Sequence, residues 1–187
     1  RLCPKGRTCE YAAVRAARVS YGLGLKTPKE DTNLLNYLIR NYHTSPLEMI
    51  TLNFRIKIPI FVARQFMRHR TFAFNEYSMR YSEAVNDFYI PDNLYTQCSN
   101  NKQGSSTEKI DESCFSEETL INKINLANQQ NFTIYKELLG CGVSREIARG
   151  VLPTNIYTEM YCSVNLNNFF KFLNLRMDSH AQWEIQE

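Results

Sequence analysis

The stretch with the most chemistry-bearing side chains is RHRTFAFNEYSMRY, residues 68–81. It opens with Arg68, His69 and Arg70, three groups that can be cationic. Successive residues at a helix end point about 100° apart, so these three could grip two separate groups but not one small anion from one side. Guanidinium groups bind phosphate or a flat carbonyl edge through paired hydrogen bonds. The alternative is that the cations only complement a helix dipole.

The continuation NEYSMRY adds a carboxylate, a hydroxyl and a guanidinium at Glu76, Ser78 and Arg80. Alternate residues of an extended segment project to the same side, so these three could wrap a polar ligand. Together with the cations before them they suit a nucleotide. A solvated charged loop is the alternative interpretation.

Two more basic groups occur further along the chain. Arg145 and Arg149 stand one helical turn apart in SREIARGVLP and repel each other unless a bound anion, or water and salt, offsets their charge. The block NLRMDSHAQWE contributes Arg176 and His180. For His180, and for His43 in NYHTSP, a structural histidine with one backbone hydrogen bond is as good an interpretation as a functional one.

Common cofactor motifs are missing from the sequence. Only GLG, residues 22–24, approaches the glycine-rich dinucleotide fingerprint, and no P-loop or G-x-S-x-G sequence occurs. The six cysteines are scattered without a C-x-x-C pair, which predicts reduced thiols and no metal site. The residues by themselves therefore predict a basic, nucleotide-compatible pocket and no particular reaction.

The first third of the chain predicts two helices, a strand and a third helix. Helix formers fill residues 11–20, and a second helix is expected from an N-cap at Asp31 or Thr32 to a stop before HTSP. The strict alternation of ITLNFRIKI, residues 50–58, predicts a half-buried strand. Pro59 then suits the start of a helix that ends at the RHR sequence.

The rest of the chain predicts further helices and one strand. The polar residues 97–119 are expected to form a mobile surface loop. Ser116 and Ser144 can cap a long and a short helix, the second ended by Pro153. YTEMYCSV predicts a strand, and the residues from LNNFFKF to the end predict one final helix. The expected class is mixed α+β without internal repeats.

Length and composition bound the kind of protein. With 187 residues and 43% hydrophobic content, a single domain over 1–187 is expected. The net charge of +3 lacks the field of a dedicated nucleic-acid binder, and no apolar run approaches the roughly 20 residues that span a bilayer. These features predict a soluble, intracellular, cytoplasmic protein without a nucleic-acid or membrane partner. Both termini are expected to be trimmed.

The RHR-x7-S spacing, followed by N-E-x-S-x-R-Y, resembles the flavin-dependent thymidylate synthases (the ThyX family). The blocks AVRAARVS, PIFVARQ, REIARGVLP and FLNLRMDSHAQWEIQ are similar to family blocks in family order. The resemblance implies reductive methylation of dUMP to dTMP, with the methylene from methylenetetrahydrofolate and the hydride from NADPH through FAD. It also implies a fold with a central α/β region and a helical part, in a homotetramer with sites at subunit interfaces.

The resemblance also assigns the site residues. The implied dUMP contacts are Gln65, Arg68, Glu76, Tyr77, Ser78, Met79, Arg80, Arg149 and Arg176. The implied FAD contacts are His43, Ser45, Arg68, His69, Arg70, Asn165, Asn167 and Lys171. Arg176 is the implied catalytic residue, because a guanidinium beside the N3/O4 edge of uracil favours negative charge there and makes C5 nucleophilic. No enzyme cysteine attacks the ring, so Cys141 and Cys162 are expected to be structural.

Three positions depart from the family pattern, namely Ala73, Asn167 and Lys171. Lys171 could hold a phosphate as a point charge where relatives often have an amide. The departures motivate one alternative, a flavoprotein of this fold without synthase activity. The aromatic residues interleaved with the arginines motivate the other, a non-catalytic nucleotide- or RNA-binding protein.

Overall fold

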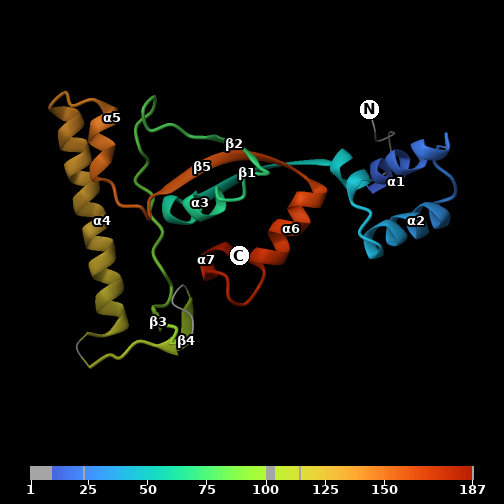
Figure 1. Cartoon of the computed structure of the whole chain (residues 1–187). Coiled ribbons are helices and arrows are strands. Elements are labelled where there is room, and N and C mark those ends of the chain that lie inside the picture. The colour runs from blue at the N-terminus through green and yellow to red at the C-terminus, as the bar shows by residue number, and fades with distance from the viewer. Residues whose placement is uncertain (1–9, 23, 100–103, 114, 187) are drawn as a thin grey trace. The chain divides into compact units, whose positions relative to one another are not determined.

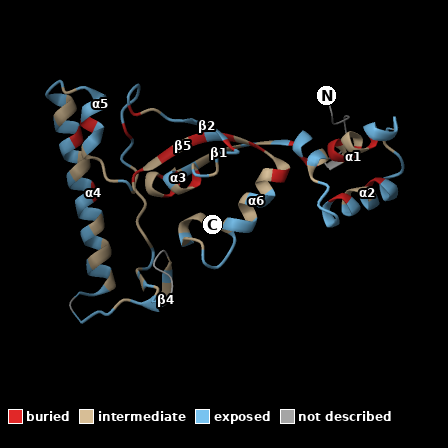
Figure 2. Ribbon diagram, in the orientation of Figure 1, coloured by how far each residue is buried: buried red, intermediate tan, exposed pale blue. Residues whose placement is uncertain are grey.

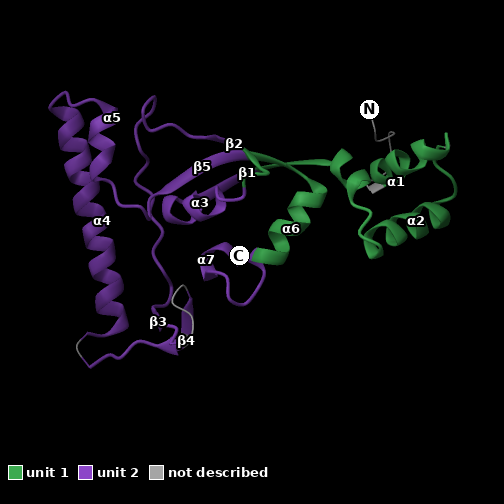
Figure 3. Ribbon diagram, viewed as in Figure 1, with its two compact units in different colours: residues 1–54, 70–73, 162–175 green, residues 55–69, 74–161, 176–187 purple. Residues whose placement is uncertain are grey.

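The computed structural model describes residues 10–22, 24–99, 104–113 and 115–186. Helices and strands are mixed along the chain, which confirms the predicted class (Figure 1). The chain divides into two compact units (Figure 3). Unit 1 comprises Arg1–Phe54, Arg70–Ala73 and Cys162–Leu175, and unit 2 comprises Arg55–His69, Phe74–Tyr161 and Arg176–Glu187.

Unit 1 begins with the two predicted helices. Helix α1 spans Glu10–Arg18 and continues as the 3-10 turn η1, Val19–Tyr21. Helix α2 spans Pro28–Arg40, and the short turn η2 spans Ser45–Met49. The small residues of α1 pack with Leu47 and Ile50 in one buried cluster.

The predicted N-cap of α2 at Asp31 or Thr32 is wrong, because Thr27 caps the helix. The Thr27 hydroxyl accepts from the Glu30 amide, and the Glu30 carboxylate accepts from the Thr27 amide. This capping box satisfies two amides that the first turn leaves without partners, and Pro28 has the φ that a first helical position needs.

Asp31 instead forms a buried ion pair. Its carboxylate lies 2.6 Å from the Arg18 guanidinium and is fully buried, while the Arg18 side chain is 7% exposed. Removing one partner of such a pair costs about 3–5 kcal/mol, because the other charge stays buried alone. The pair therefore locks α1 to α2, and hydrophobic periodicity gave no indication of it.

Tyr42 ends helix α2 in a conformation that usually belongs to glycine. Its φ is +56°, the Tyr42 amide donates to the Ile39 carbonyl, and the His43 amide donates to the Leu38 carbonyl. These two bonds form a Schellman motif, whose left-handed position favours glycine. The Tyr42 side chain is 86% exposed and so gains little burial in return.

We expect Tyr42→Gly to raise the free energy of unfolding by about 0.5–1 kcal/mol, because relief of the left-handed strain outweighs the entropy that glycine adds to the unfolded chain. Tyr42→Ala is the matched control, since it removes the same ring but keeps a Cβ. Chemical denaturation at one protein concentration compares the three proteins. Equal stability of the Gly and Ala variants would show that the conformation stores no strain.

The main sheet contains three strands in the order β1-β5-β2. Strand β1 spans Thr51–Pro59 with the alternating burial that the sequence predicted, β5 spans Tyr157–Asn165, and β2 spans Ala73–Glu76. Strand β5 lies between the other two and carries four buried side chains, visible as the red residues along it in Figure 2. The predicted helix after Pro59 is confirmed as α3, Ile60–Phe66, but it ends before the RHR sequence, which it was expected to carry at its C-terminal end.

The expected loop over 97–119 is wrong in its first part, which forms a hairpin. Strand β3, Tyr95–Gln97, pairs antiparallel with β4, Ser105–Lys109. The Thr96 and Ser106 hydroxyls hydrogen-bond each other at 2.6 Å. Cross-strand pairs of small hydroxyl residues stabilise a hairpin without any hydrophobic alternation, which explains why periodicity did not predict it.

Unit 2 also contains the long helix α4, Glu117–Gly140, with the predicted N-cap at Ser116. Helix α5, Arg145–Ala148, begins after Ser144 and continues as the turn η3, Arg149–Val151. Their core centres on Tyr135, which is fully buried and whose hydroxyl accepts from the Ala84 amide at 2.9 Å.

The prediction of a single final helix is wrong, because this part of the chain forms two helices, α6 (Leu166–Arg176) and α7 (Trp183–Gln186). Asp178 interrupts them by accepting hydrogen bonds from the amide and the ring of His180. Aspartate side chains compete in this way with helical backbone bonds.

Candidate active site

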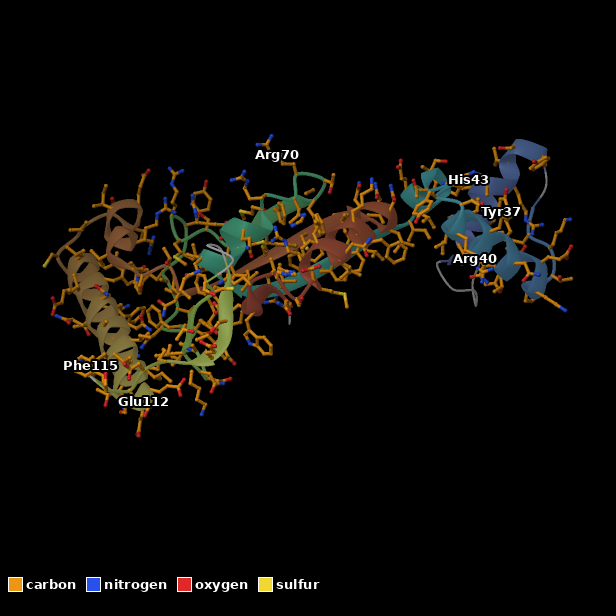
Figure 4. All side chains as sticks on the ribbon, turned by 60° about the horizontal axis from the view of Figure 1, so that its bottom comes forward. Tyr37, Arg40, His43, Arg70, Glu112 and Phe115 are labelled. Carbon is orange, nitrogen blue, oxygen red and sulfur yellow. The ribbon has the colours of Figure 1, made fainter. Side chains whose placement is uncertain are left out.

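The RHR sequence lies where the chain leaves α3. The helix ends at Phe66, and the His69 amide donates to the Phe66 carbonyl at 3.0 Å. Arg68 and Arg70 are exposed, whereas His69 is half-buried. Arg70 extends away from the ribbon in Figure 4. The histidine is thus the member of the three that the fold holds in place.

His69 accepts a hydrogen bond from Arg176, which lies 107 positions later in the sequence. The Arg176 Nε atom donates to His69 Nε2 at 2.8 Å. An acceptor nitrogen must carry a lone pair, so the imidazole is neutral and its proton is on Nδ1. Burial, and then the positive charge of Arg176, lower the pKa of His69 below its usual value, which favours the neutral form.

The extended strand β2 ends at Glu76, so the expectation of an extended segment from Glu76 through Arg80 is wrong. Ser78 begins a turn, in which its carbonyl accepts from the amides of Tyr81 and Ser82, and its hydroxyl accepts from the Arg80 amide at 3.3 Å. Serine commonly diverts backbone bonding from strand to turn in this way.

Strand β5 fixes the start of this segment. The Thr158 hydroxyl donates to Glu76 Oε1 at 2.8 Å, and the Tyr77 amide donates to the Glu159 carbonyl at 2.8 Å. The threonine was not among the predicted site residues. Thr158 shares the buried face of β5 with Met160, Cys162 and Val164, two, four and six positions further along the strand. A buried hydroxyl needs a hydrogen-bond partner, and this is the signal that could have identified the threonine.

Met79 anchors the turn in the core of unit 2. It belongs to the same buried cluster as Ala148, the residue directly before Arg149. The fold therefore brings the turn close to the helix α5 that precedes Arg149. Glu146 connects them further, because its carboxylate lies 3.6 Å from the Arg80 guanidinium and its carbonyl accepts from Arg149 Nε at 3.4 Å.

Carboxylates already offset part of the positive charge in this region. Glu83 pairs with Lys136 at 2.8 Å and lies 3.9 Å from the Arg145 guanidinium. The hydrogen bond and charge of Lys136 lower the pKa of Glu83, so it stays ionised. Glu83 thus offsets part of the charge of Arg145, so the repulsion between Arg145 and Arg149 does not by itself require a bound anion.

The side-chain oxygen of Gln65 is a candidate for contact with a ligand. Its Oε1 is buried and has no hydrogen-bond partner among the described residues. A buried, unpaired amide oxygen is costly, and a bound molecule with an N–H group would satisfy it. Gln65 lies in α3, three positions before the RHR sequence.

The residues assigned to FAD by resemblance lie mostly in unit 1. His43 is exposed, and its ring meets that of Tyr37 edge to face at 5.7 Å (Figure 4). Ser45 and Lys171 are also exposed. Phe72 and Phe172 pack with ring centroids 5.4 Å apart, which joins the segment of Arg70 to the helix of Lys171.

The two assigned asparagines already make structural hydrogen bonds. Asn165 Oδ1 accepts from the Asn168 amide at 2.9 Å and so caps α6. Asn167 is buried, and its Nδ2 donates to Glu48 Oε1 at 3.2 Å. Exposed cations on two contacting segments and an exposed histidine are donors that a pyrophosphate and a heteroaromatic ring can use, so unit 1 fits a flavin dinucleotide.

The described cysteines, Cys98, Cys141 and Cys162, are free thiols, whereas Cys3, Cys9 and Cys114 lie outside the described residues. Cys162 is buried in β5, and burial raises its pKa. A thiol is nucleophilic as the thiolate, so Cys162 is poorly suited to attack a substrate.

We expect iodoacetamide to alkylate Cys162 in the native protein roughly tenfold or more slowly than in the denatured protein, because the buried thiol rarely ionises. Peptide mass mapping reads each cysteine separately, with exposed Cys141 as the internal comparison. Equal native and denatured rates at Cys162 would contradict its burial.

The residues that the structure describes contain no cluster of histidine, cysteine and carboxylate side chains able to hold a metal ion. None of the helices within those same ranges combines the length and apolar character needed to cross a membrane.

The fold is mixed helix and sheet, and it joins Arg176 to a half-buried histidine of the RHR sequence. Guanidinium groups of this kind can bind the phosphate or the flat base edge of a nucleotide. Residues 4–187 match the family described as thymidylate synthase complementing protein, and the chain belongs to that family.

Two curated relatives share the name flavin-dependent thymidylate synthase. The chain is 49% identical over 178 residues to the flavin-dependent thymidylate synthase of Thermosipho africanus, covering 95% of this chain and 77% of the relative. It is 48% identical over 178 residues to the enzyme of that name from Thermus thermophilus, covering 95% of this chain and 64% of the relative.

The fold is also similar to that of solved structures. A UMP/dUMP methylase, PolB from Streptomyces cacaoi, bound with 5-Br dUMP, superposes with a TM-score of 0.81 at 34% identity, covering 95% of this chain and 80% of the other. Its complex with 5-Br UMP gives a TM-score of 0.80 at 34% identity, covering 95% and 79%.

Proposed function

We propose that the chain is a flavin-dependent thymidylate synthase that converts dUMP to dTMP. The observation that carries the proposal is the hydrogen bond between His69 and Arg176, which joins the RHR sequence to the arginine implied to activate uracil. The family relatives and the dUMP-bound neighbour support the same reaction.

The residues assigned to dUMP all lie in unit 2. Arg176 places positive charge against the N3/O4 edge of uracil, so that negative charge on the ring is stabilised and electron density at C5 rises. C5 then bonds to the methylene carbon of methylenetetrahydrofolate and loses the proton that it carried, while the bond from that carbon to the folate nitrogen breaks and releases tetrahydrofolate. Gln65 Oε1 is free to accept from an N–H group of the nucleotide.

The other dUMP contacts position the nucleotide around this step. They are Arg68, Glu76, Tyr77, Ser78, Met79, Arg80 and Arg149. Ser78 binds the nucleotide and does not attack it as a nucleophile. Its hydroxyl accepts from the Arg80 amide, and among the described residues no basic side chain hydrogen-bonds to it.

FAD, when bound, would supply a hydride, received from NADPH, that reduces the transferred carbon to a methyl group. The residues that would hold it are His43, Ser45, Arg68, His69, Arg70, Asn165, Asn167 and Lys171. Arg70 and Lys171 offset phosphate charge, and Asn165 and Asn167 shape the site through the bonds that hold α6.

A homotetramer of single-domain chains is the proposed working form, with dUMP and further copies of the chain as partners. The exposure of His43, Ser45, Arg70 and Lys171 supports it, because a second chain could cover a ligand that these side chains leave open.

The reaction is tested by release of tritium from dUMP labelled at C5. We expect release and dTMP formation only when FAD, NADPH and methylenetetrahydrofolate are all present. Bound flavin that oxidises NADPH without forming dTMP would instead support an inactive flavoprotein. Salt-sensitive RNA binding that ignores dUMP would support the non-catalytic alternative.

Arg176→Ala should lower kcat by about 100-fold or more, because it removes the charge that stabilises the activated ring. Flavin absorbance of the purified variant should remain, since the arginine is assigned to the pyrimidine. Lys123→Ala is the control, as it removes an exposed cation of unit 2 whose ammonium lies 3.5 Å from the centroid of the Phe115 ring. Figure 4 labels Phe115. Turnover of Arg176→Ala at the wild-type rate would refute the assignment.

A further inference from the structure

The hydrogen bond between His69 and Arg176 joins residues that the family resemblance assigns to different ligands, flavin and uracil. We propose that His69 is a positioning residue for Arg176, which it orients as a neutral acceptor without cancelling its charge. The inference rests on the proposed function for its catalytic meaning, while the interaction itself is measurable without turnover.

His69 is the anchored member of the pair. Its amide donates to Phe66, its ring lies against the Phe66 ring with centroids 6.5 Å apart, and Phe66 is buried. Phe66 in turn packs edge to face on Phe74 of β2 at 5.2 Å. Arg176 is the last residue of α6 and has a long, flexible side chain. The histidine therefore fixes the arginine, and not the reverse.

The bonded atom decides how Arg176 can meet a ligand. A guanidinium grips a flat partner through one of two edges, Nε with one Nη or the two Nη atoms together. Because Nε donates to His69, the pair of Nη atoms forms the edge left for bidentate contact. The imidazole thus selects one orientation of the charge relative to the pyrimidine.

The neutrality of the acceptor matters as much as its position. A carboxylate at this place would hold the guanidinium equally well but would offset its charge, and with it the electrostatic effect on uracil. A protonated imidazole has no lone pair at Nε2 and would repel Arg176. Burial and Arg176 are the two effects that lower the pKa of His69, and Arg68 and Arg70 adjoin it in the chain.

The first test uses ¹⁵N NMR of the imidazoles in the full protein, which contains only three histidines. We expect His69 to be neutral with its proton on Nδ1, and to titrate below the ordinary value of 6.5. Arg176→Ala should raise the pKa of His69, because a nearby positive charge is removed. A His69 protonated on Nε2, or a titration unchanged in Arg176→Ala, would overturn the inference.

The second test compares three substitutions of His69. His69→Gln keeps a neutral acceptor near the Nε2 position, His69→Glu adds a negative charge, and His69→Leu removes the acceptor. We expect kcat to fall roughly 10- to 100-fold in the Glu and Leu variants and less in the Gln variant. The wild-type kcat should also fall as pH drops through the lowered pKa of His69, and the Gln variant should lack that decline.

A double-mutant cycle separates this role from a role through flavin. If His69 acts through Arg176, His69→Leu has no further effect on kcat in the Arg176→Ala background. If the effects of the two substitutions on kcat multiply and His69→Leu also loses flavin absorbance, His69 acts on the cofactor, and the inference is overturned. Absence of dTMP formation by the wild type would refute the proposed function alone, because the NMR result decides the interaction independently.

Discussion

Strand β5 is the constraint on which the rest of the site depends. It lies between β1 and β2, and its residues give Glu76 and Tyr77 their partners. It then continues directly into α6, where Asn165 caps the helix that ends at Arg176. A middle strand has neighbours on both edges, so its position is fixed more firmly than that of an edge strand.

Polar side chains that form structural bonds surround the arginines. Glu83 offsets the charges of Lys136 and Arg145, Glu146 lies beside Arg80, and the serine at position 78 shapes the turn. Such pairs at an exposed surface contribute little stability individually. They nevertheless offset part of the positive charge that the arginines bring to this region.

The departures from the family pattern concern unit 1 and not the arginine of unit 2. Asn167 is buried and bonded to Glu48, while Lys171 is exposed beside the contact of Phe72 with Phe172. A buried amide shapes the backbone, whereas an exposed ammonium can move toward a phosphate. The strained Tyr42, directly before His43, is a further feature of the same unit.

The sequence by itself determined the mixed fold class, the alternating strand after residue 50, the cap at Ser116 and the family, because these follow from local periodicity, capping chemistry and motif spacing. Ser144 does precede the short helix α5, but its side chain makes no capping hydrogen bond. It misplaced the start of α2, made one helix of α6 and α7, and overlooked the hairpin, since side-chain hydrogen bonds of Thr27, Asp178 and Thr96 outweigh hydrophobic patterning there. Only the tertiary structure brought Arg176 to His69 and Thr158 to Glu76. Those bonds join residues 107 and 82 positions apart, and the partner of a distant donor is decided by packing, which no local pattern records.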